Sequence, residues 1–345
     1  MFPLQTTVIE ITNRCNLRCP HCASASGCQR EDELSRAELQ EVFVQLKGLG
    51  CRRVTILGGE FLLRPDWFEV ASDVKAAGME LTLITNGLLV TEEIRRQFLS
   101  LEPRTIGVSL DGATPETYRR QRGVDGFRRV LDLIFALQKD GVRQVNAITT
   151  FTSLNISEFD DFAELFRDTG IVWQVQLAHK AGSRFDDALL LSQKQYEFFV
   201  GKVTHYLYDW HGHLNLMTMD DFGYFSMDPR LRFTHQLFTG CPAGTRVLGI
   251  RSNGDVLGCL SLGDEFVEAN VRKTLLEEIW TSGRYFGCFR NKLQYLTGHC
   301  AKCAFAGKCR AGCTAQAISM GGCIGDNFFC VRRLEEQRLL DDIFA

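Results

Sequence analysis

Three cysteines stand close together in the run NRCNLRCPHC, directly after the short apolar stretch TVIEIT. Their CxxxCxxC spacing places Cys15, Cys19 and Cys22 on a loop that follows a predicted strand. A cubane iron–sulfur cluster normally takes four thiolate ligands. Three thiolates would therefore hold such a cluster and leave one iron free to bind a small molecule.

Two simpler interpretations compete with the cluster. The cysteines could form a zinc knuckle, with His21 as a fourth ligand, or they could be buried thiols without a ligand. Zinc prefers four ligands, typically a CxxC pair that faces a second pair. After Cys22, Cys28 alone follows at a comparable spacing, so the zinc pattern is incomplete.

A second group of cysteines occupies the C-terminal third of the chain. Cys241 is followed by twelve residues, Gly254, four residues and Cys259. The segment VLGIRSNGDVLGCL predicts a β-hairpin that turns at Asn253-Gly254, which would hold these two thiolates near each other. A pair of structural zinc sites is the alternative for this region. Four later cysteines, Cys300, Cys303, Cys309 and Cys313, form a CxxC-x5-C-x3-C pattern, and Cys330 follows further along the chain.

The stretch between the two cysteine regions alternates short β-rich runs with helical patterns, and this alternation builds parallel βα units. Six units are too few for a closed eight-stranded barrel. The sequence therefore predicts an α/β fold, an open partial (β/α)6 TIM-like barrel, with its chemistry on loops at the carboxyl ends of the strands. The predicted strands are TVIEIT, RVTIL (53–57), ELTLIT (80–85), TIGVSL (105–110), VNAITT (145–150) and WQVQL (173–177).

Glycine-rich and polar motifs end three of these strands. The second strand is followed by Gly58-Gly59-Glu60, the third ends in Thr85-Asn86-Gly87 and the fourth in Ser109-Leu110-Asp111-Gly112. Glycine lets the backbone approach a ligand closely or adopt a positive φ, and a carboxylate beside it can pair with an ammonium group. Ordinary turns are the alternative, because Asn-Gly and Asp-Gly are common turn formers.

The cysteine loop and the Gly-Gly-Glu motif together resemble the signature of radical S-adenosylmethionine (SAM) enzymes. The resemblance implies that the free iron chelates SAM, and that reduction cleaves SAM to a 5'-deoxyadenosyl radical that abstracts a substrate hydrogen. It also implies that His21 packs near the adenine and that Glu60 pairs with the SAM ammonium. The family usually has proline where this chain has Phe61, so the turn is expected to differ. Further SAM contacts are implied at Gly58, Gly59, Thr85, Asn86, Ser109 and Asp111.

The seven C-terminal cysteines match, one by one, the pattern of the SPASM extension in a radical SAM subgroup. The resemblance implies two auxiliary iron–sulfur clusters. The family often places a fourth ligand of cluster I six residues after the first, where this chain has Val247. We therefore expect an open iron, a non-cysteine ligand or a smaller cluster there, and Cys288 is a candidate replacement. The implied ligands are Cys241, Cys259 and Cys313 for cluster I, and Cys300, Cys303, Cys309 and Cys330 for cluster II.

An auxiliary cluster is a candidate acceptor for one electron from a substrate radical, since cluster potentials span about −700 to +450 mV. This favours an oxidoreductase that modifies a peptide, either a ribosomally made precursor or a protein to be matured. A thiol such as Cys288 or Cys323 could instead return a hydrogen atom, as a peptide epimerase requires. The motifs are also compatible with a small-molecule dehydrogenase, with an enzyme of haem, cofactor or aminoglycoside biosynthesis, and with a non-catalytic iron–sulfur or zinc protein.

The partners follow from the same resemblance. Precursor-peptide enzymes often begin with a leader-binding domain, and the chain starts shortly before the cysteine loop, so a separate leader-binding protein is a candidate partner. Sulfatase maturases have an Asp after the cysteine equivalent to Cys259, where this chain has Leu260, which disfavours a sulfatase substrate. An external donor such as flavodoxin or ferredoxin is expected to supply electrons. The sequence identifies no catalytic acid, base or hydrogen donor.

Composition excludes several further classes of protein. The 345 residues include 39 Lys and Arg against 42 Asp and Glu, a net charge of −3, so a nucleic-acid partner is not expected. The chain has neither a signal peptide nor the ~18-residue apolar run of a membrane span. Five of the 14 cysteines lie between positions 15 and 51 and nine between 241 and 330. Exposed thiols of this kind persist in a reducing compartment, so a cytoplasmic location is expected.

The cysteine distribution also divides the chain into three predicted regions. Residues 1–178 form the barrel core, and residues 241–345 form the SPASM domain with a C-terminal helix. Residues 179–240 form a bridging segment that is expected to wall the substrate pocket. Within it, His211 and His213 beside Trp210 are expected to lie in a packed or solvated turn rather than to bind a metal.

Overall fold

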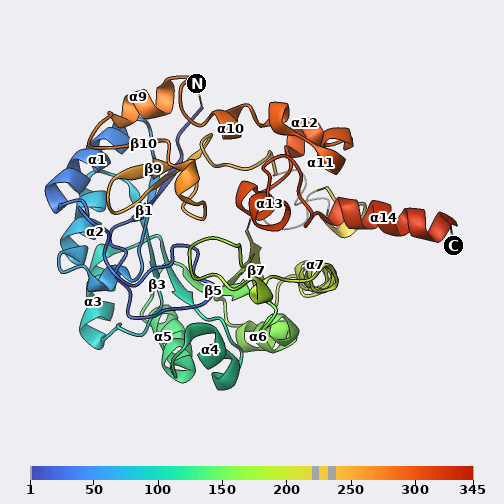
Figure 1. Ribbon diagram of the computed structural model, residues 1–345. Coiled ribbons are helices and arrows are strands. Elements are labelled where there is room, and N and C mark those ends of the chain that lie inside the picture. Colours follow the sequence, from blue (N-terminus) through green and yellow to red (C-terminus); the bar gives the residue numbers. More distant parts are fainter. Residues whose placement is uncertain (1, 220–224, 232–237, 345) are drawn as a thin grey trace.

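The computed structural model describes residues 2–219, 225–231 and 238–344 (Figure 1). Residues 220–224 and 232–237 of the predicted bridging segment therefore lie outside the described residues. The centre of the molecule is a ten-stranded sheet with the order β10-β9-β8-β1-β2-β3-β4-β5-β6-β7. In the described part of the chain, no helix is both long and apolar enough to cross a membrane.

Seven strands pair in parallel, in the order in which they follow along the chain. They curve into an open partial barrel (Figure 1), which confirms the expected fold class, and each of the six predicted strands is present. The seventh was not predicted, because NLMT is short and mostly half-exposed, so its sequence pattern is weak. The strands are β1 (Thr6–Glu10), β2 (Arg53–Leu57), β3 (Glu80–Thr85), β4 (Thr105–Ser109), β5 (Val145–Phe151), β6 (Val172–Leu177) and β7 (Asn215–Thr218).

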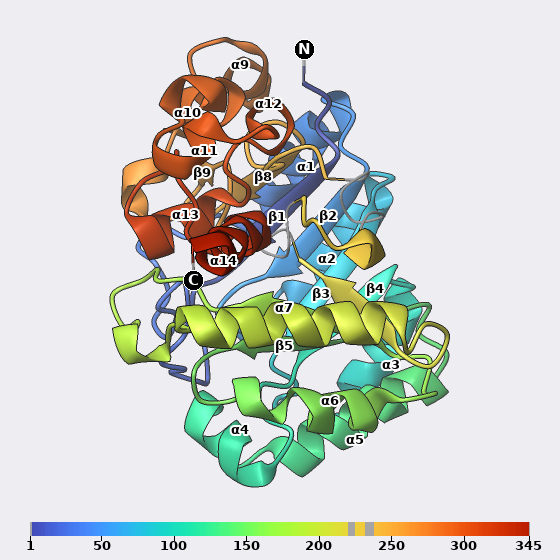
Figure 2. The same cartoon turned by 90° about the vertical axis from the view of Figure 1, so that its right-hand side faces the viewer.

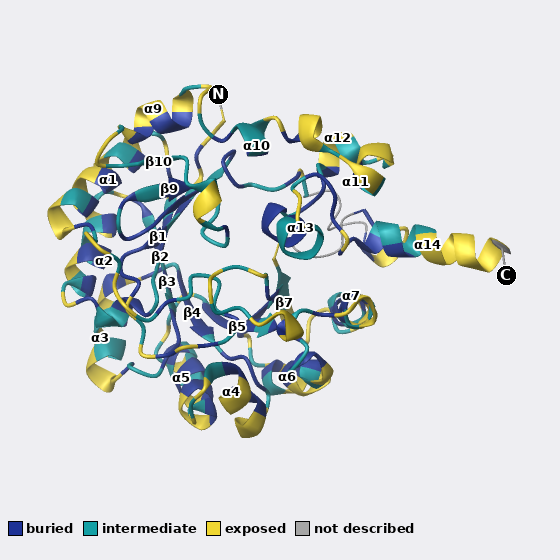
Figure 3. Cartoon of the chain, viewed as in Figure 1, coloured by how far each residue is buried: buried dark blue, intermediate teal, exposed yellow. Residues whose placement is uncertain are grey.

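Helices cover the outer face of the barrel and turn their buried sides toward the sheet (Figure 3). In α1 the buried residues Leu39, Val42, Phe43 and Leu46 recur with the helical period, and a capping box at Ser35 fixes where the helix begins. The helices of this layer are α1 (Arg36–Gly48), α2 (Trp67–Ala76), α3 (Glu92–Leu101), α4 (Pro115–Arg122), α5 (Phe127–Lys139), α6 (Phe159–Phe166) and α7 (Gln193–Tyr208). Short 3-10 turns lie at η1 (Phe61–Leu63), η2 (Ile156–Glu158) and η3 (Asp187–Leu189).

The predicted C-terminal hairpin is present as β8 (Val247–Ile250) and β9 (Asp255–Leu257), with Gly254 at a φ of +90° in its turn. β8 pairs in parallel with β1, so the hairpin continues the barrel sheet. After the hairpin, β10 extends the sheet, α9 packs against α1, and α14 projects away from the body beside α7 (Figures 1 and 2). The elements after the hairpin are β10 (Ala269–Asn270), α9 (Leu276–Thr281), α10 (Gly287–Arg290), α11 (Gly298–Lys302), α12 (Ala306–Cys309), α13 (Thr314–Gly321) and α14 (Val331–Phe344), with 3-10 turns η5 (Asp264–Phe266) and η6 (Lys292–Tyr295). A further 3-10 turn, η4 (Pro229–Leu231), precedes the hairpin.

The loop after β1 is fixed in place by the turn after β2. Gly59 N donates to Thr12 O at 2.8 Å, and Glu60 N donates to Arg14 O at 2.7 Å. A Cβ on Gly58 would lie 2.3 Å from Thr12 O, and one on Gly59 would lie 2.3 Å from Arg14 O. These glycines were expected to let a ligand approach the backbone. In the structure, the close neighbour is the backbone of the cysteine loop itself.

Replacing Gly59 with alanine should therefore destabilise the protein. The added Cβ would have to displace backbone rather than a flexible side chain, and overpacking of this kind costs about 1 to 3 kcal/mol. The measurement is the free energy of unfolding in denaturant. Gly48→Ala is the matched control, because a Cβ at Gly48 in α1 meets nothing within 4 Å. If both variants were equally stable, the packing role of Gly59 would be wrong.

Candidate active site

A cavity of about 260 Å³ lies at the carboxyl ends of the parallel strands, where the sequence predicted the chemistry. Cys15, Cys19 and Cys22 line it from the loop after β1. Residues at the ends of five further strands, β2 to β6, line the same cavity. The structure thus brings together most of the motifs that the sequence singled out, namely Gly58, Gly59, Thr85, Asn86 and Ser109 beside the three cysteines and His21.

The cysteine loop folds back on itself. Cys15 N donates to Gly27 O at 3.2 Å, and Cys22 N donates to Cys19 O at 3.2 Å. Burial raises the pKa of Cys15 to about 11, so metal binding there would displace a thiol proton. Within the described ranges, no three His, Cys, Asp or Glu side chains converge on one ion-sized position. The donor set, three soft sulfurs at the wall of a cavity, fits an iron–sulfur cluster with one iron open to a ligand.

Glu60 is fully buried and, like Asp111, is not among the residues that line this cavity, although its neighbours Gly59, Thr85 and Asn86 are. Its carboxylate accepts hydrogen bonds from Thr85 Oγ1 at 2.9 Å, from Asn86 N at 2.8 Å and from Leu62 N at 3.4 Å. Burial raises the pKa of Glu60 to about 7. Among the described residues no cationic side chain forms an ion pair with it. A ligand that carries an ammonium group would supply the missing counter-charge, so this carboxylate fits the family's amino-acid cofactor.

Asp111 lies behind the cavity rather than in its wall. Its Oδ2 atom is 3.0 Å from His21 Nε2 and 2.6 Å from Arg122 Nη2, and its Oδ1 atom accepts Thr150 N at 2.7 Å. Burial alone would raise the pKa of Asp111, but Arg122 and His21 hold that pKa below its usual value. Asp111 therefore positions two residues that do line the cavity, and the direct SAM contact implied for it stays a prediction.

Arg122, at the end of α4, is a site residue that the sequence analysis missed. Its Nη1 atom lies 3.8 Å from Cys19 Sγ, and its side chain lines the cavity. Although burial opposes its charge, the Asp111 carboxylate raises the pKa of Arg122 above its usual value. The run RRQR contains three arginines with nothing in the sequence to separate the buried one from its neighbours Arg119 and Arg120.

The other missed residues come from β5, β6 and the segments after β6 and β9. Gln176 and His179 line the cavity from one side, Thr150 lines it from β5, and Ser261 lines it from the hairpin end. Burial lowers the pKa of His179 to about 4, so its imidazole is neutral near pH 7. Ser261 follows Cys259 by two residues, which places the hairpin at the edge of the cavity.

The described part of the bridging segment packs against the cysteine loop. Arg184 Nη2 donates to Ser26 O at 2.7 Å, and a Cβ on Gly182 would lie 2.7 Å from Ala23 O. A second cavity, of about 380 Å³, has Gly182 in its wall and shares Ala23 and Ser24 with the first cavity. The two cavities therefore adjoin around this part of the loop.

The four cysteines grouped by sequence as the ligands of auxiliary cluster II line one small cavity of about 20 Å³, together with Phe225, Phe305 and Arg332. Burial raises the pKa of Cys300 and of Cys309 to about 12 and that of Cys330 to about 11. Four cysteines beside a single small cavity supply the ligand number of a cluster bound by four thiolates. The ligands implied for cluster I, Cys241, Cys259 and Cys313, are partly buried and pack against the main core.

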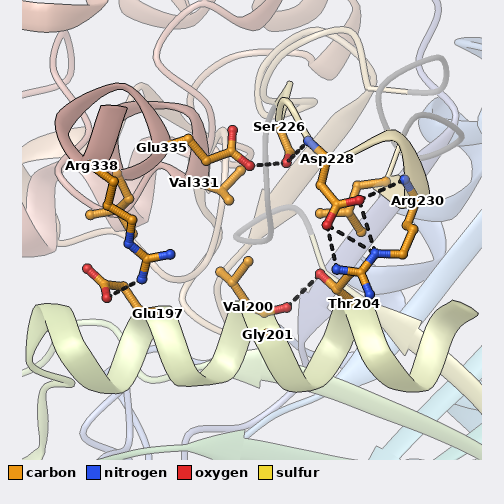
Figure 4. A pocket seen from close by; sticks show the side chains of 12 residues that line it. Glu197, Val200, Gly201, Thr204, Ser226, Asp228, Arg230, Val331, Glu335 and Arg338 are labelled. Atoms are coloured by element: carbon orange, nitrogen blue, oxygen red, sulfur yellow. Dashed lines mark hydrogen bonds and ion pairs between the residues drawn. The ribbon is translucent and has the colours of Figure 1, made fainter. Parts of the chain in front are cut away.

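A further cavity, of about 190 Å³, lies between α7 and α14 (Figure 4), and the residues that line it include no cysteine. Its charged side chains pair with one another or with polar neighbours. Glu197 pairs with Arg338, Asp228 with Arg230, and Glu335 accepts a hydrogen bond from Ser226. Nothing about this cavity indicates chemistry of the kind found at the cysteine loop.

Comparison with known proteins agrees with this geometry. Residues 9–166 match the family model of the radical SAM superfamily, and residues 241–304 match that of the SPASM iron–sulfur cluster-binding domain. The AdoMet-dependent heme synthase of Methanosarcina barkeri is 29% identical and covers 94% of this chain and 95% of its own length. The mycofactocin maturase MftC of Mycobacterium tuberculosis is 27% identical over 90% of this chain and 78% of its own.

Solved structures share the fold. Streptococcus suis SuiB bound to precursor peptide SuiA has a TM-score of 0.76 at 20% identity, covering 95% of this chain and 76% of SuiB. anSMEcpe with bound AdoMet has a TM-score of 0.74 at 18% identity, covering 98% of both chains. The radical SAM domain binds a 4Fe–4S cluster and SAM, and the SPASM domain binds additional iron–sulfur clusters. The chain therefore belongs to the radical SAM superfamily and is an enzyme of its SPASM subgroup.

Proposed function

We propose that this enzyme oxidises a peptide held between the barrel and the SPASM hairpin. One observation carries the proposal, namely the composition of the cavity wall at the carboxyl ends of the strands. Cys15, Cys19 and Cys22 line it from the barrel, and Ser261, next to the Cys259 segment, lines it from the hairpin. A substrate there would lie close both to the source of the radical and to a ligand of auxiliary cluster I.

The residues in and beside the wall have distinct roles in this proposal. Cys15, Cys19 and Cys22 would hold the first cluster, which, with one electron from an external donor, would supply the cleavage of SAM to methionine and a hydrogen-abstracting 5'-deoxyadenosyl radical. A substrate that gives up a hydrogen atom to this radical would lose a further electron to an auxiliary cluster and a proton to solvent. Glu60 receives the ammonium group of SAM, and Thr85 and Asn86 orient the Glu60 carboxylate. His21 is held against the cavity by Asp111. Gly58, Gly59 and Ser109 are the remaining contacts that we assign to SAM.

A peptide is favoured by the space available. A cavity of about 260 Å³ lies below the usual range of ligand pockets, roughly 300 to 1,000 Å³, so the cofactor would occupy most of it. The substrate would then extend into the adjoining cavity of about 380 Å³, and an elongated substrate suits two connected spaces. The similarity to mycofactocin maturases supports a maturation reaction. A separate leader-binding protein and a cytoplasmic location stay predictions.

A porphyrin is the second candidate substrate. It is favoured by the similarity to the AdoMet-dependent heme synthase, which extends over 94% of this chain. The two candidates differ in size and rigidity, so a direct comparison of both substrates separates them.

The test is anaerobic incubation of the full chain with SAM, a reductant and either a candidate precursor peptide or an iron porphyrin, followed by mass spectrometry. We expect a peptide that has lost two hydrogens, and we expect the amount of 5'-deoxyadenosine to rise in proportion to the modified peptide. The variant with Cys15, Cys19 and Cys22 all replaced by alanine should form neither product, because it lacks the cluster that binds SAM. A modified porphyrin with an unchanged peptide would establish the second candidate instead.

Glu60→Gln should weaken SAM binding about tenfold or more, because a hydrogen bond to a charged group contributes about 1.5 to 3 kcal/mol. The pKa of Glu60 is raised to about 7, so the binding-competent carboxylate is lost as the pH falls through that value. Wild-type affinity should therefore decline between pH 8 and pH 6, and the variant should lack this part of the pH dependence. Isothermal titration with SAM measures both effects, with the exposed Glu92→Gln as control. Equal pH profiles for wild type and Glu60→Gln would remove Glu60 from the SAM site.

Electron delivery gives a further prediction. Arg18 and Arg184 both lie near Gly27 of the cysteine loop. Arg18 Cζ and Arg184 Nη1 are each 3.6 Å from the position that a Cβ on Gly27 would occupy. In the described part of the chain, neither arginine forms an ion pair. We propose that these arginines attract an acidic donor such as flavodoxin. Charge reversal at Arg18, to Glu or to Asp, should slow cluster reduction by flavodoxin about tenfold at low salt, because electrostatic steering raises association rates about 10- to 1,000-fold and is screened by salt. Arg184 stays unchanged in the test, since its hydrogen bond to Ser26 O supports the cysteine loop.

Reduction by dithionite, which needs no docking, should be unchanged in these variants. Arg128→Glu, on the exposed side of α5, is the control for total charge. Stopped-flow measurement of cluster bleaching gives the rates. A rate with flavodoxin that is the same in all variants would place the donor elsewhere.

A further inference from the structure

The three cysteines assigned to auxiliary cluster I leave its fourth ligand open. The position where the family often has a cysteine is Val247, whose hydrocarbon side chain cannot bind iron and whose backbone is paired with Thr6 of β1. We propose that Cys288 is the fourth ligand of auxiliary cluster I. The proposal concerns the cluster alone and does not depend on which substrate the enzyme modifies.

Cys288 lies in α10, a short helix that packs against the turn after Cys241. Arg290 Nε donates to Gly244 O at 2.9 Å. A Cβ on Gly244 would lie 2.9 Å from Phe286 Cβ. Residues on both sides of Cys288 therefore contact the residue three positions after Cys241.

α10 and the turn that follows it, η6, pack against the segments that carry the other two ligands. A Cβ on Gly258, directly before Cys259, would lie 2.8 Å from Phe289 Cε2. Lys292, in η6, is buried and donates from Nζ to Gly312 O at 3.0 Å and to Thr314 Oγ1 at 2.8 Å. These two acceptors stand immediately before and after Cys313. The neighbours of Cys288 thus contact the neighbours of all three assigned ligands.

The environment of the Cys288 sulfur agrees with this placement. Burial raises the pKa of Cys288 to about 11, and the Glu268 carboxylate and the Cys241 sulfur act in the same direction. Cys288 packs against the same hydrophobic core as the three assigned ligands. On binding iron, its thiol would release a proton to solvent.

The structure argues against the other role considered for this thiol. A hydrogen donor would have to face the cavity at the cysteine loop, and the residues that line that cavity do not include Cys288. Cys323 also lies outside it, and its exposed sulfur is 3.9 Å from Thr297 Oγ1. Cys288 is therefore a candidate for ligation, and Cys323 is a suitable control.

The test compares Cys288→Ala and Cys288→Ser with Cys323→Ala in the full chain. All three are made in a background with Cys15, Cys19 and Cys22 replaced by alanine, so that only auxiliary clusters contribute to the signal. Iron content and electron paramagnetic resonance spectra are measured after anaerobic purification. We expect Cys288→Ala to lower the iron content per chain and to change the spectrum of one auxiliary cluster, because one iron of that cluster would lose its protein ligand. Cys323→Ala should match the background protein.

Cys288→Ser covers the case in which the alanine variant does not fold. An oxygen ligand can retain the cluster, so we expect near-normal iron content with an altered spectrum and reduction potential. Soluble Cys288 variants with the same iron content, spectrum and potential as the background would overturn the proposal. Because none of these measurements uses substrate, their outcome is separate from that of the peptide experiment.

Discussion

The structure depends on the way the loop after β1 is fastened to the ends of two neighbouring strands. Two backbone hydrogen bonds, to Thr12 O and Arg14 O, hold the loop against the turn after β2. The last residue of that turn, Glu60, then accepts hydrogen bonds from Thr85 and Asn86 at the end of β3. Three strand ends are thereby connected through backbone and buried polar groups. The position of the three cysteines follows from this connection, because the loop has little regular structure of its own.

A second set of contacts joins the cysteine loop to the C-terminal hairpin. β8 pairs with β1, and just beyond this pairing Ser252 donates to Glu10 Oε1 at 2.9 Å from its hydroxyl. Glu33 accepts hydrogen bonds from Asn13 N at 2.8 Å and from the Ser252 hydroxyl at 3.2 Å. The two cysteine regions are more than 200 residues apart in sequence, yet one strand pair and a few buried carboxylate contacts fix their relative position. An enzyme that passes an electron between clusters needs such a fixed separation.

Charge is distributed unevenly around the cavity. The buried Asp111 carboxylate has a cationic partner in Arg122 at 2.6 Å, so its charge is compensated within the fold. Glu60 has hydrogen-bond donors but no ion pair among the described residues, and burial raises its pKa. A buried carboxylate without a counter-charge is costly in the absence of a ligand. The two carboxylates therefore differ in kind: Asp111 stabilises the architecture, whereas Glu60 is suited to a cationic ligand.

The sequence alone determined the features that depend on local pattern. Strand and helix periods predicted the six βα units, and Asn253-Gly254 predicted the hairpin turn. The resemblance of the cysteine pattern to the SPASM extension grouped the four cysteines that line one small cavity. Tertiary structure decided the pairing of β8 with β1, the burial of Asp111 behind the cavity and the choice of Arg122 among adjacent arginines. It also decided which segments surround Cys288. The reason is physical: periodicity and ligand spacing are properties of neighbouring residues, whereas burial and strand partners depend on segments far apart in the chain.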